Sequence, residues 1–264
     1  MDGPDLGTAV ANAYRVFARY RLHGRLDVCR CNCCVGPEQE RLLLVTPLQE
    51  IPSALLAEYT NSAHSWSPQV SEELRYFLPR YFDLLAAGDV PCQLGIEICL
   101  ARLANVSYRD EWPQPEAKAI DGFFAALLRK RLEEPATFVE TGGLPAYHAE
   151  AGEDVLCMAA HAGGDMERLL AVWDAVEGRE ATLRLAQIIG AADWLKKRLR
   201  NSSWYDAVSP RIIAAMDQVI AWLMRPEIRA RLEAACLSEA DPAAAALLSH
   251  AESLVAGLAK ARSE

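Results

Sequence analysis

Apolar residues recur at spacings of three and four positions along most of the chain, and this period is what most restricts the fold. In residues 71–87, Leu74, Phe77, Leu78 and Tyr81 fall on one face of an α-helix. The same spacing recurs in other segments, among them residues 7–22, 92–104, 115–133 and 180–199. No stretch shows the alternation of a half-buried strand with a partner nearby. We therefore predict an all-α fold, a multi-helix bundle or irregular helical array of roughly a dozen helices.

One stretch interrupts the helical pattern. Its helix-breaking residues are Pro135, Gly142, Gly143, Pro145 and Gly152. Regular structure is not expected there, and a strand fragment at residues 137–139 has no obvious partner. We predict an N-terminal helical region over residues 1–134, a linker or long loop over 135–152 and a C-terminal helical region over 153–264. The two regions can also pack as one domain.

Charge restricts the class of partner. The 264 residues carry a formal net charge of −9, with a pI near 5.2. Binding to nucleic acid or to an anionic membrane would require a basic face, so neither is expected. The first five residues are acidic and polar, unlike a signal peptide, and no run approaches the roughly 18 apolar residues that span a bilayer. The sequence predicts a cytoplasmic protein with reduced thiols.

Four of the eight cysteines lie in the six-residue stretch Cys29-Arg30-Cys31-Asn32-Cys33-Cys34. The C-x-x-C spacing from Cys31 to Cys34 allows two thiolates to bind one zinc ion, as in a zinc knuckle. The candidate metal ligands are Cys31, Cys34, Cys29, His23 and His64. Two alternatives stay open, because cysteine also packs as a small hydrophobic residue or takes part in redox chemistry.

Motifs typical of catalysis are missing from the sequence. It contains no G-x-S-x-G, no P-loop and no G-x-G-x-x-G, and its five histidines are scattered. We predict a protein that is not an enzyme, with no cofactor other than a structural zinc ion.

Acidic residues outnumber basic ones in residues 51–100, where six acidic side chains stand against two arginines. This segment is either a solvated acidic face or a surface for a basic partner. Exposed aromatic residues would also suit an interface, although such residues usually belong to the core. The candidate partner-binding residues are Glu58, Glu72, Glu73, Asp83, Asp89, Trp66, Trp204 and Tyr205.

Residues 27–87 resemble a group of uncharacterised bacterial helical proteins. The features that carry the resemblance are the sequences Cys31-Asn32-Cys33-Cys34-Val35, Thr46-Pro47-Leu48, Leu55-Leu56-Ala57-Glu58-Tyr59 and Phe77-Leu78-Pro79-Arg80. Cys29 and Cys33 are additions to the plainest form of that pattern. Proteins of this group are often encoded beside polymorphic or contact-dependent toxins, so the resemblance implies an immunity protein or a related stand-alone binding protein.

The resulting functional hypothesis is a non-enzymatic protein that neutralises a basic bacterial toxin domain through an acidic helical surface. The alternative is a zinc-dependent enzyme or sensor that uses the loop from Cys29 to Cys34.

Overall fold

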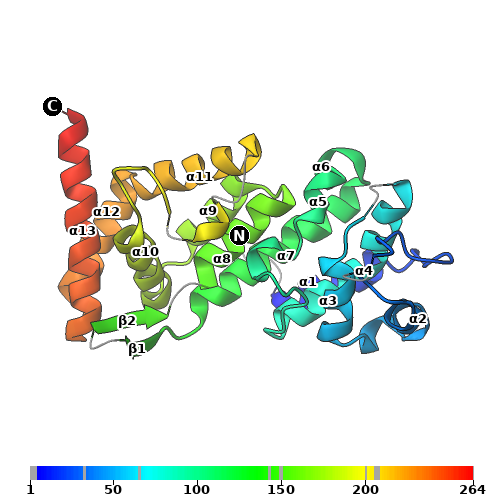
Figure 1. The fold of residues 1–264 in the computed structure, drawn as a ribbon. Coiled ribbons are helices and arrows are strands. Elements are labelled where there is room, and N and C mark those ends of the chain that lie inside the picture. The colour runs from blue at the N-terminus through cyan, green and yellow to red at the C-terminus, as the bar shows by residue number, and fades with distance from the viewer. Residues whose placement is uncertain are drawn as a thin grey trace. The chain divides into compact units, whose positions relative to one another are not determined.

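Helices account for nearly all regular structure in the computed structural model, which describes residues 5–31, 34–64, 67–141, 144–148, 151–199, 201–204 and 209–263. Within these ranges there are thirteen α-helices and one two-stranded hairpin (Figure 1). The predicted all-α class is confirmed. The chain divides into two compact units, residues 1–127 with 161–164, and residues 128–160 with 165–264. Each unit is described by itself.

The first unit is built around α4. Its helices are α1 (Leu6–Val16), α2 (Pro37–Val45), α3 (Ser53–Asn61), α4 (Pro68–Ala86), α5 (Arg102–Asn105), α6 (Tyr108–Glu111) and the first part of α7 (Gln114–Glu133), with 3₁₀ turns at Leu48–Glu50 and Ile96–Ile98. Helix α1 packs on α4, and α2 packs on α3. In the core, the rings of Phe82 and Phe123 stack in parallel with centroids 3.9 Å apart. Both side chains are fully buried, so the aromatic residues of α4 and α7 form the centre of this unit.

The second unit contains the rest of α7, strands β1 (Thr137–Thr141) and β2 (Leu144–His148), and most of α8 (Ala151–Ala162). It continues through α9 (Met166–Ala175), α10 (Arg179–Ala191), a 3₁₀ turn (Ser202–Trp204), α11 (Pro210–Leu223), α12 (Pro226–Ser238) and α13 (Pro242–Ser263). Helix α13, drawn in orange to red in Figure 1, packs against α10 and α12. Its buried positions Ala244, Leu248, Ala251 and Val255 follow the spacing of one helix face.

Proline marks the start of several helices, including α4, which begins at Pro68 rather than at the predicted residue 71. Pro37, Pro68, Pro210 and Pro226 each occupy the first turn of a helix, where a missing N–H leaves no hydrogen bond unmade. Pro79 is different, because it lies inside α4 and is buried there while the helix continues to Ala86.

The prediction of irregular structure over residues 135–152 is wrong in part. Strands β1 and β2 form an antiparallel hairpin, with Thr137 opposite His148 and Thr141 opposite Leu144. The strand fragment at residues 137–139 therefore finds its partner a few residues further along the chain, and the hairpin belongs to the second unit.

Three predicted helices also end differently. Helix α1 stops at Val16 rather than near residue 22, and α10 stops at Ala191 rather than at 199. After α10, Asp193 and Arg198 form an isolated antiparallel bridge. Residues 92–104 contain only a 3₁₀ turn and the short α5, since Gly95 has a φ of 118°, which ends helical geometry.

One helix in the described part of the chain is long and apolar enough to cross a membrane by length and composition alone. It is α13, over Pro242–Lys260, with a mean hydropathy of 1.2. The expectation that no segment meets this criterion is therefore corrected. The helix packs one face against α10 and α12, and 22% of this stretch is buried.

Candidate metal centre

The cysteine loop brings three thiols together. The Sγ atoms of Cys29, Cys31 and Cys34 all lie within 4.8 Å of one another, and those of Cys31 and Cys34 are 3.4 Å apart. A backbone turn causes this proximity, because the Cys34 N–H donates to the Cys31 carbonyl at 3.4 Å. The cluster is therefore capable of holding a metal ion.

The thiols are not packed in the core. Cys31 is exposed, and Cys29 and Cys34 are half-buried. By contrast, Cys99 and Cys157 are buried and behave as the small hydrophobic residues that the packing alternative describes. The exposure of the clustered thiols favours chemistry at this loop over simple packing.

Two buried carboxylates fix the chain that leads into the loop. The Glu40 carboxylate accepts a hydrogen bond from the Leu26 backbone N–H at 2.8 Å. It also accepts hydrogen bonds from both terminal nitrogens of the Arg30 guanidinium, at 2.5 and 3.0 Å. Glu73 accepts the backbone N–H of Asp27 at 2.8 Å. Because a carboxylate that accepts several hydrogen bonds is held in one position, the segment before Cys29 is anchored to α2 and α4.

Both ends of the cysteine loop, at Cys29 and Val35, are hydrogen-bonded to the residues that follow α3. The Cys29 N–H donates to the Ala63 carbonyl at 2.7 Å, and the Val35 N–H donates to Ser62 Oγ at 2.9 Å. The guanidinium of Arg102 in turn donates to the carbonyls of Tyr59, Thr60 and Ser62 at 2.9, 2.5 and 2.6 Å. The Ser62 N–H also donates to the Tyr59 carbonyl at 3.3 Å, and Arg102 adds to this cap at the helix end against which the loop rests.

The neighbouring thiols also affect the ionisation of Cys29. A backbone hydrogen bond with Cys31 lowers the pKa of the Cys29 thiol. Three opposing effects outweigh it: the hydrogen bond with the Cys31 thiol, desolvation, and the hydrogen bond with the Cys34 thiol. The pKa of Cys29 is therefore raised. Three neighbouring thiolates repel one another, whereas a bound cation would stabilise all three in the ionised form.

Neither predicted histidine ligand joins the described cluster. His23 is exposed, and the cluster consists of the three thiols. The ring of His64 packs edge-on against Tyr59, with centroids 4.8 Å apart, and its Nε2 lies 3.3 Å from the Tyr59 carbonyl. Burial, together with the charge of Arg102, lowers the pKa of His64 to about 4. Neither His23 nor His64 belongs to the cluster of three thiols, and their assignment as ligands stays a prediction, while Cys33 lies outside the described residues.

The predicted acidic surface is only partly present. Glu73 is 3% exposed, because it accepts hydrogen bonds from Asp27, Tyr59 and Gln69 in the interior, and burial raises its pKa. Its assignment to a partner surface is wrong, and its role is to anchor the cysteine loop. The other four acidic candidates keep contact with solvent: Glu72 and Asp89 are exposed, and Glu58 and Asp83 are half-buried.

The aromatic candidates do not form an exposed patch in the described residues. Trp204 is 1% exposed and donates its indole N–H to Glu153 Oε1 at 3.1 Å, so its assignment to an interface is wrong. Trp66 and Tyr205 lie outside the described residues.

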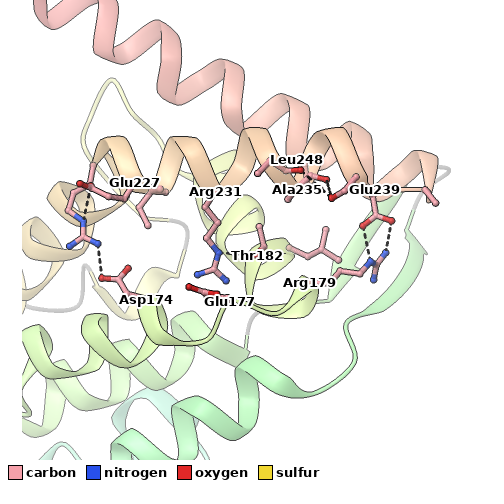
Figure 2. Close-up of a pocket in the computed structure, with 15 residues that line it drawn as sticks. Asp174, Glu177, Arg179, Thr182, Glu227, Arg231, Ala235, Glu239 and Leu248 are labelled. Atoms are coloured by element: carbon pink, nitrogen blue, oxygen red, sulfur yellow. Dashed lines mark hydrogen bonds and ion pairs between the residues drawn. The ribbon is translucent and has the colours of Figure 1, made fainter. Parts of the chain in front are cut away.

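The second unit contains a cavity of about 800 Å³ that the sequence did not indicate. In Figure 2, Asp174 and Glu227 lie at one end, Arg179 and Glu239 at the other, and Arg231 between them. Each end contains an ion pair. At one end Arg225 pairs with Asp174 at 2.6 Å, and at the other Arg179 donates to both carboxylate oxygens of Glu239 at 2.8 and 3.2 Å.

Arg231 has a structural role in this cavity. It donates to Thr182 Oγ1 at 2.9 Å and to the carbonyls of Trp173 and Val176 at 3.4 and 2.6 Å. These carbonyls end α9, so Arg231 caps that helix as Arg102 caps α3. Burial of the guanidinium lowers its pKa. The lining is therefore explained by helix capping and ion pairs, and the cysteine loop remains the stronger candidate site.

Comparison with known proteins adds no assignment. No protein-family model matches the chain, and neither a curated protein nor a solved structure matches it. The resemblance of residues 27–87 to bacterial immunity-type proteins stays a prediction.

Proposed function

We propose that the protein binds a soft, thiophilic metal ion through Cys29, Cys31 and Cys34, with Zn²⁺ as the ion to test. The observation that supports this proposal is the convergence of three sulfur atoms within 4.8 Å on an anchored loop. An anchored loop loses little conformational freedom when the ion binds, and this favours affinity.

The donor set favours a particular class of ion. Three sulfur ligands suit zinc or cuprous copper, whereas magnesium and calcium prefer oxygen. The three ligands found among the described residues leave one position of a tetrahedral ion open, and Cys31 of this cluster is exposed to solvent. An open, solvent-facing position favours an exchangeable ion, as in a sensor, over the closed tetrahedral site of a purely structural zinc.

The test is the metal content of the full chain. Protein equilibrated with zinc and desalted is expected to retain one ion per chain by elemental analysis, and the Cys31→Ser/Cys34→Ser variant is expected to retain none. Zinc should also stabilise the native protein against heat, by about 2.7 kcal/mol when free zinc is a hundredfold above its Kd. Both effects follow from binding to the folded loop.

Two variants make this test specific. Cys92→Ser changes a half-buried thiol of the same unit that lies outside the cluster, so it should retain zinc as the unmodified chain does. Cys33→Ser reports whether the remaining cysteine of the loop contributes a ligand. The proposal fails if the unmodified chain retains no zinc, or if the double variant retains as much as Cys92→Ser.

We also propose, as a second candidate, that the protein neutralises a basic toxin domain. The accessible carboxylates Glu58, Glu72, Asp83 and Asp89 support it, since opposite charge accelerates association. Deleting the gene in a cell that encodes a neighbouring toxin should then cause self-intoxication, and the chain should form a complex with that toxin. A viable deletion strain and no complex would refute this candidate.

A further inference from the structure

We infer that Cys31 and Cys34 form a reversible disulfide with each other, and that this reaction switches the metal site off. The pairing of the two thiols stands on the geometry of the loop alone. The release of metal rests in addition on the proposed function.

The first support is the position of the two sulfurs. The Sγ atoms of Cys31 and Cys34 are already 3.4 Å apart, so a small side-chain adjustment brings them to bonding distance. Their backbones are joined by the turn hydrogen bond from the Cys34 N–H to the Cys31 carbonyl. The ends of such a turn lie less than about 7 Å apart between Cα atoms, which is close to the range that disulfides span.

The second support is access. Cys31 is exposed, whereas Cys34 is half-buried. An incoming disulfide can therefore reach the more exposed Cys31 first, and Cys34, with its Sγ 3.4 Å from that of Cys31, can complete the exchange. Thiol–disulfide exchange requires one accessible thiol that forms the mixed disulfide, here Cys31, and a second thiol that displaces it, here Cys34.

The reaction balances with a small-molecule disulfide as the oxidant. The Cys31 thiolate attacks one sulfur of that disulfide, forms a mixed disulfide and releases one small thiolate. The Cys34 thiolate then attacks the Cys31 sulfur and releases the second. Two electrons pass from the protein to the oxidant, the two thiol protons end on the two released thiols, and one Cys31–Cys34 bond is formed.

The consequence for the metal site follows from ligand count. Of the three clustered thiols, only Cys29 remains a free thiol after the disulfide forms. A single thiolate cannot hold zinc against solvent, because protein zinc sites use at least three ligands. Oxidation should therefore release the ion, and a reducing thiol should restore the site.

The experiment uses the full chain, reduced and desalted, in zinc-free and zinc-loaded form, with oxidised glutathione as the oxidant. Two of the eight thiols should be lost to titration, and fragment mass spectrometry should place the new bond between Cys31 and Cys34. Zinc-loaded protein should release its ion to a metallochromic dye in step with thiol loss. Dithiothreitol should reverse both changes.

Variants separate this pairing from its neighbours. Cys33→Ser and Cys92→Ser should still lose two thiols, while Cys29→Ser/Cys34→Ser should give only a glutathione adduct on Cys31. A bond to Cys29 or Cys33 instead, or separate adducts on Cys31 and Cys34, would overturn the inference. If zinc never binds but the disulfide forms, the metal proposal fails and the release of metal fails with it, while the pairing of Cys31 with Cys34 stands. If zinc binds and oxidised glutathione leaves both the thiols and the ion in place, only the switch fails.

Discussion

Replacing Glu116 with alanine is expected to lower the free energy of unfolding of the first unit by about 3–5 kcal/mol, the range for removing one partner of a buried ion pair. The Glu116 side chain is nearly inaccessible and accepts hydrogen bonds from Arg19, from the Tyr20 hydroxyl at 2.6 Å and from Arg75 Nε at 3.0 Å. The Arg75 guanidinium also lies over the Trp112 ring, 4.1 Å from its centroid. Alanine would leave the largely buried Arg75 charge without its carboxylate.

Urea denaturation of the full chain, followed by fluorescence and by amide hydrogen exchange in residues 1–127, measures this loss. The matched control is Glu38→Ala, which removes an exposed pair with Arg41 three residues away. Such surface pairs contribute at most about 1 kcal/mol, so the control should change little. Equal effects of the two substitutions would show that the buried carboxylate does not hold the N-terminal segment in place.

Replacing Glu40 with alanine is expected to cost about 3 kcal/mol and to weaken zinc binding at the cysteine loop. The substitution leaves the buried Leu26 N–H without its acceptor and removes the carboxylate partner of Arg30, and each lost buried hydrogen bond costs about 1–3 kcal/mol. Because residues 26–30 then lose their anchor, the thiols should no longer be held together before the ion arrives.

The same carboxylate predicts a pH dependence. The Arg30 side-chain hydrogen bond outweighs the effect of burial and, with the Leu26 N–H, holds the pKa of Glu40 below its ordinary value. Its stabilisation is therefore present above the ordinary carboxyl pKa and is lost as the pH falls through the lower, folded-state pKa. Glu40→Ala should flatten this part of the stability profile. Zinc affinity measured at neutral pH, beside Glu38→Ala as control, completes the test, and unchanged affinity would contradict the anchoring role.

Local features of the fold could be predicted from the sequence. Apolar spacing indicated the helices, and prolines such as Pro210 and Pro226 marked their starts, because both signals act within one turn of helix. The cysteine cluster was likewise visible, since its members are at most five positions apart. The hairpin was missed although Gly142-Gly143 is a typical hairpin dipeptide, because its strands are short and carry no clear alternation.

Contacts between distant segments could not be predicted. Glu73 looked like a surface residue at the start of a helix, but its acceptor atoms are used by Asp27, 46 positions away, and by Tyr59. Trp204 looked exposed in a polar loop, but Glu153, 51 positions away, accepts its indole N–H. In both cases burial is favourable because tertiary packing brings a hydrogen-bonding partner from a distant part of the chain. A short stretch of sequence does not show that partner.

The three buried carboxylates of the first unit also constrain the order in which the chain can fold as it is synthesised. Glu40 binds Arg30 and Leu26, which are 10 and 14 positions away in the sequence. Glu116 binds Arg19 and Tyr20, which are 97 and 96 positions away. Helix α1 leaves the ribosome early, yet the carboxylate that fixes the segment after it arrives about a hundred residues later. During that interval Arg19, Tyr20 and Arg75 must stay hydrated, so closure of the N-terminal unit is a late event that waits for the start of α7.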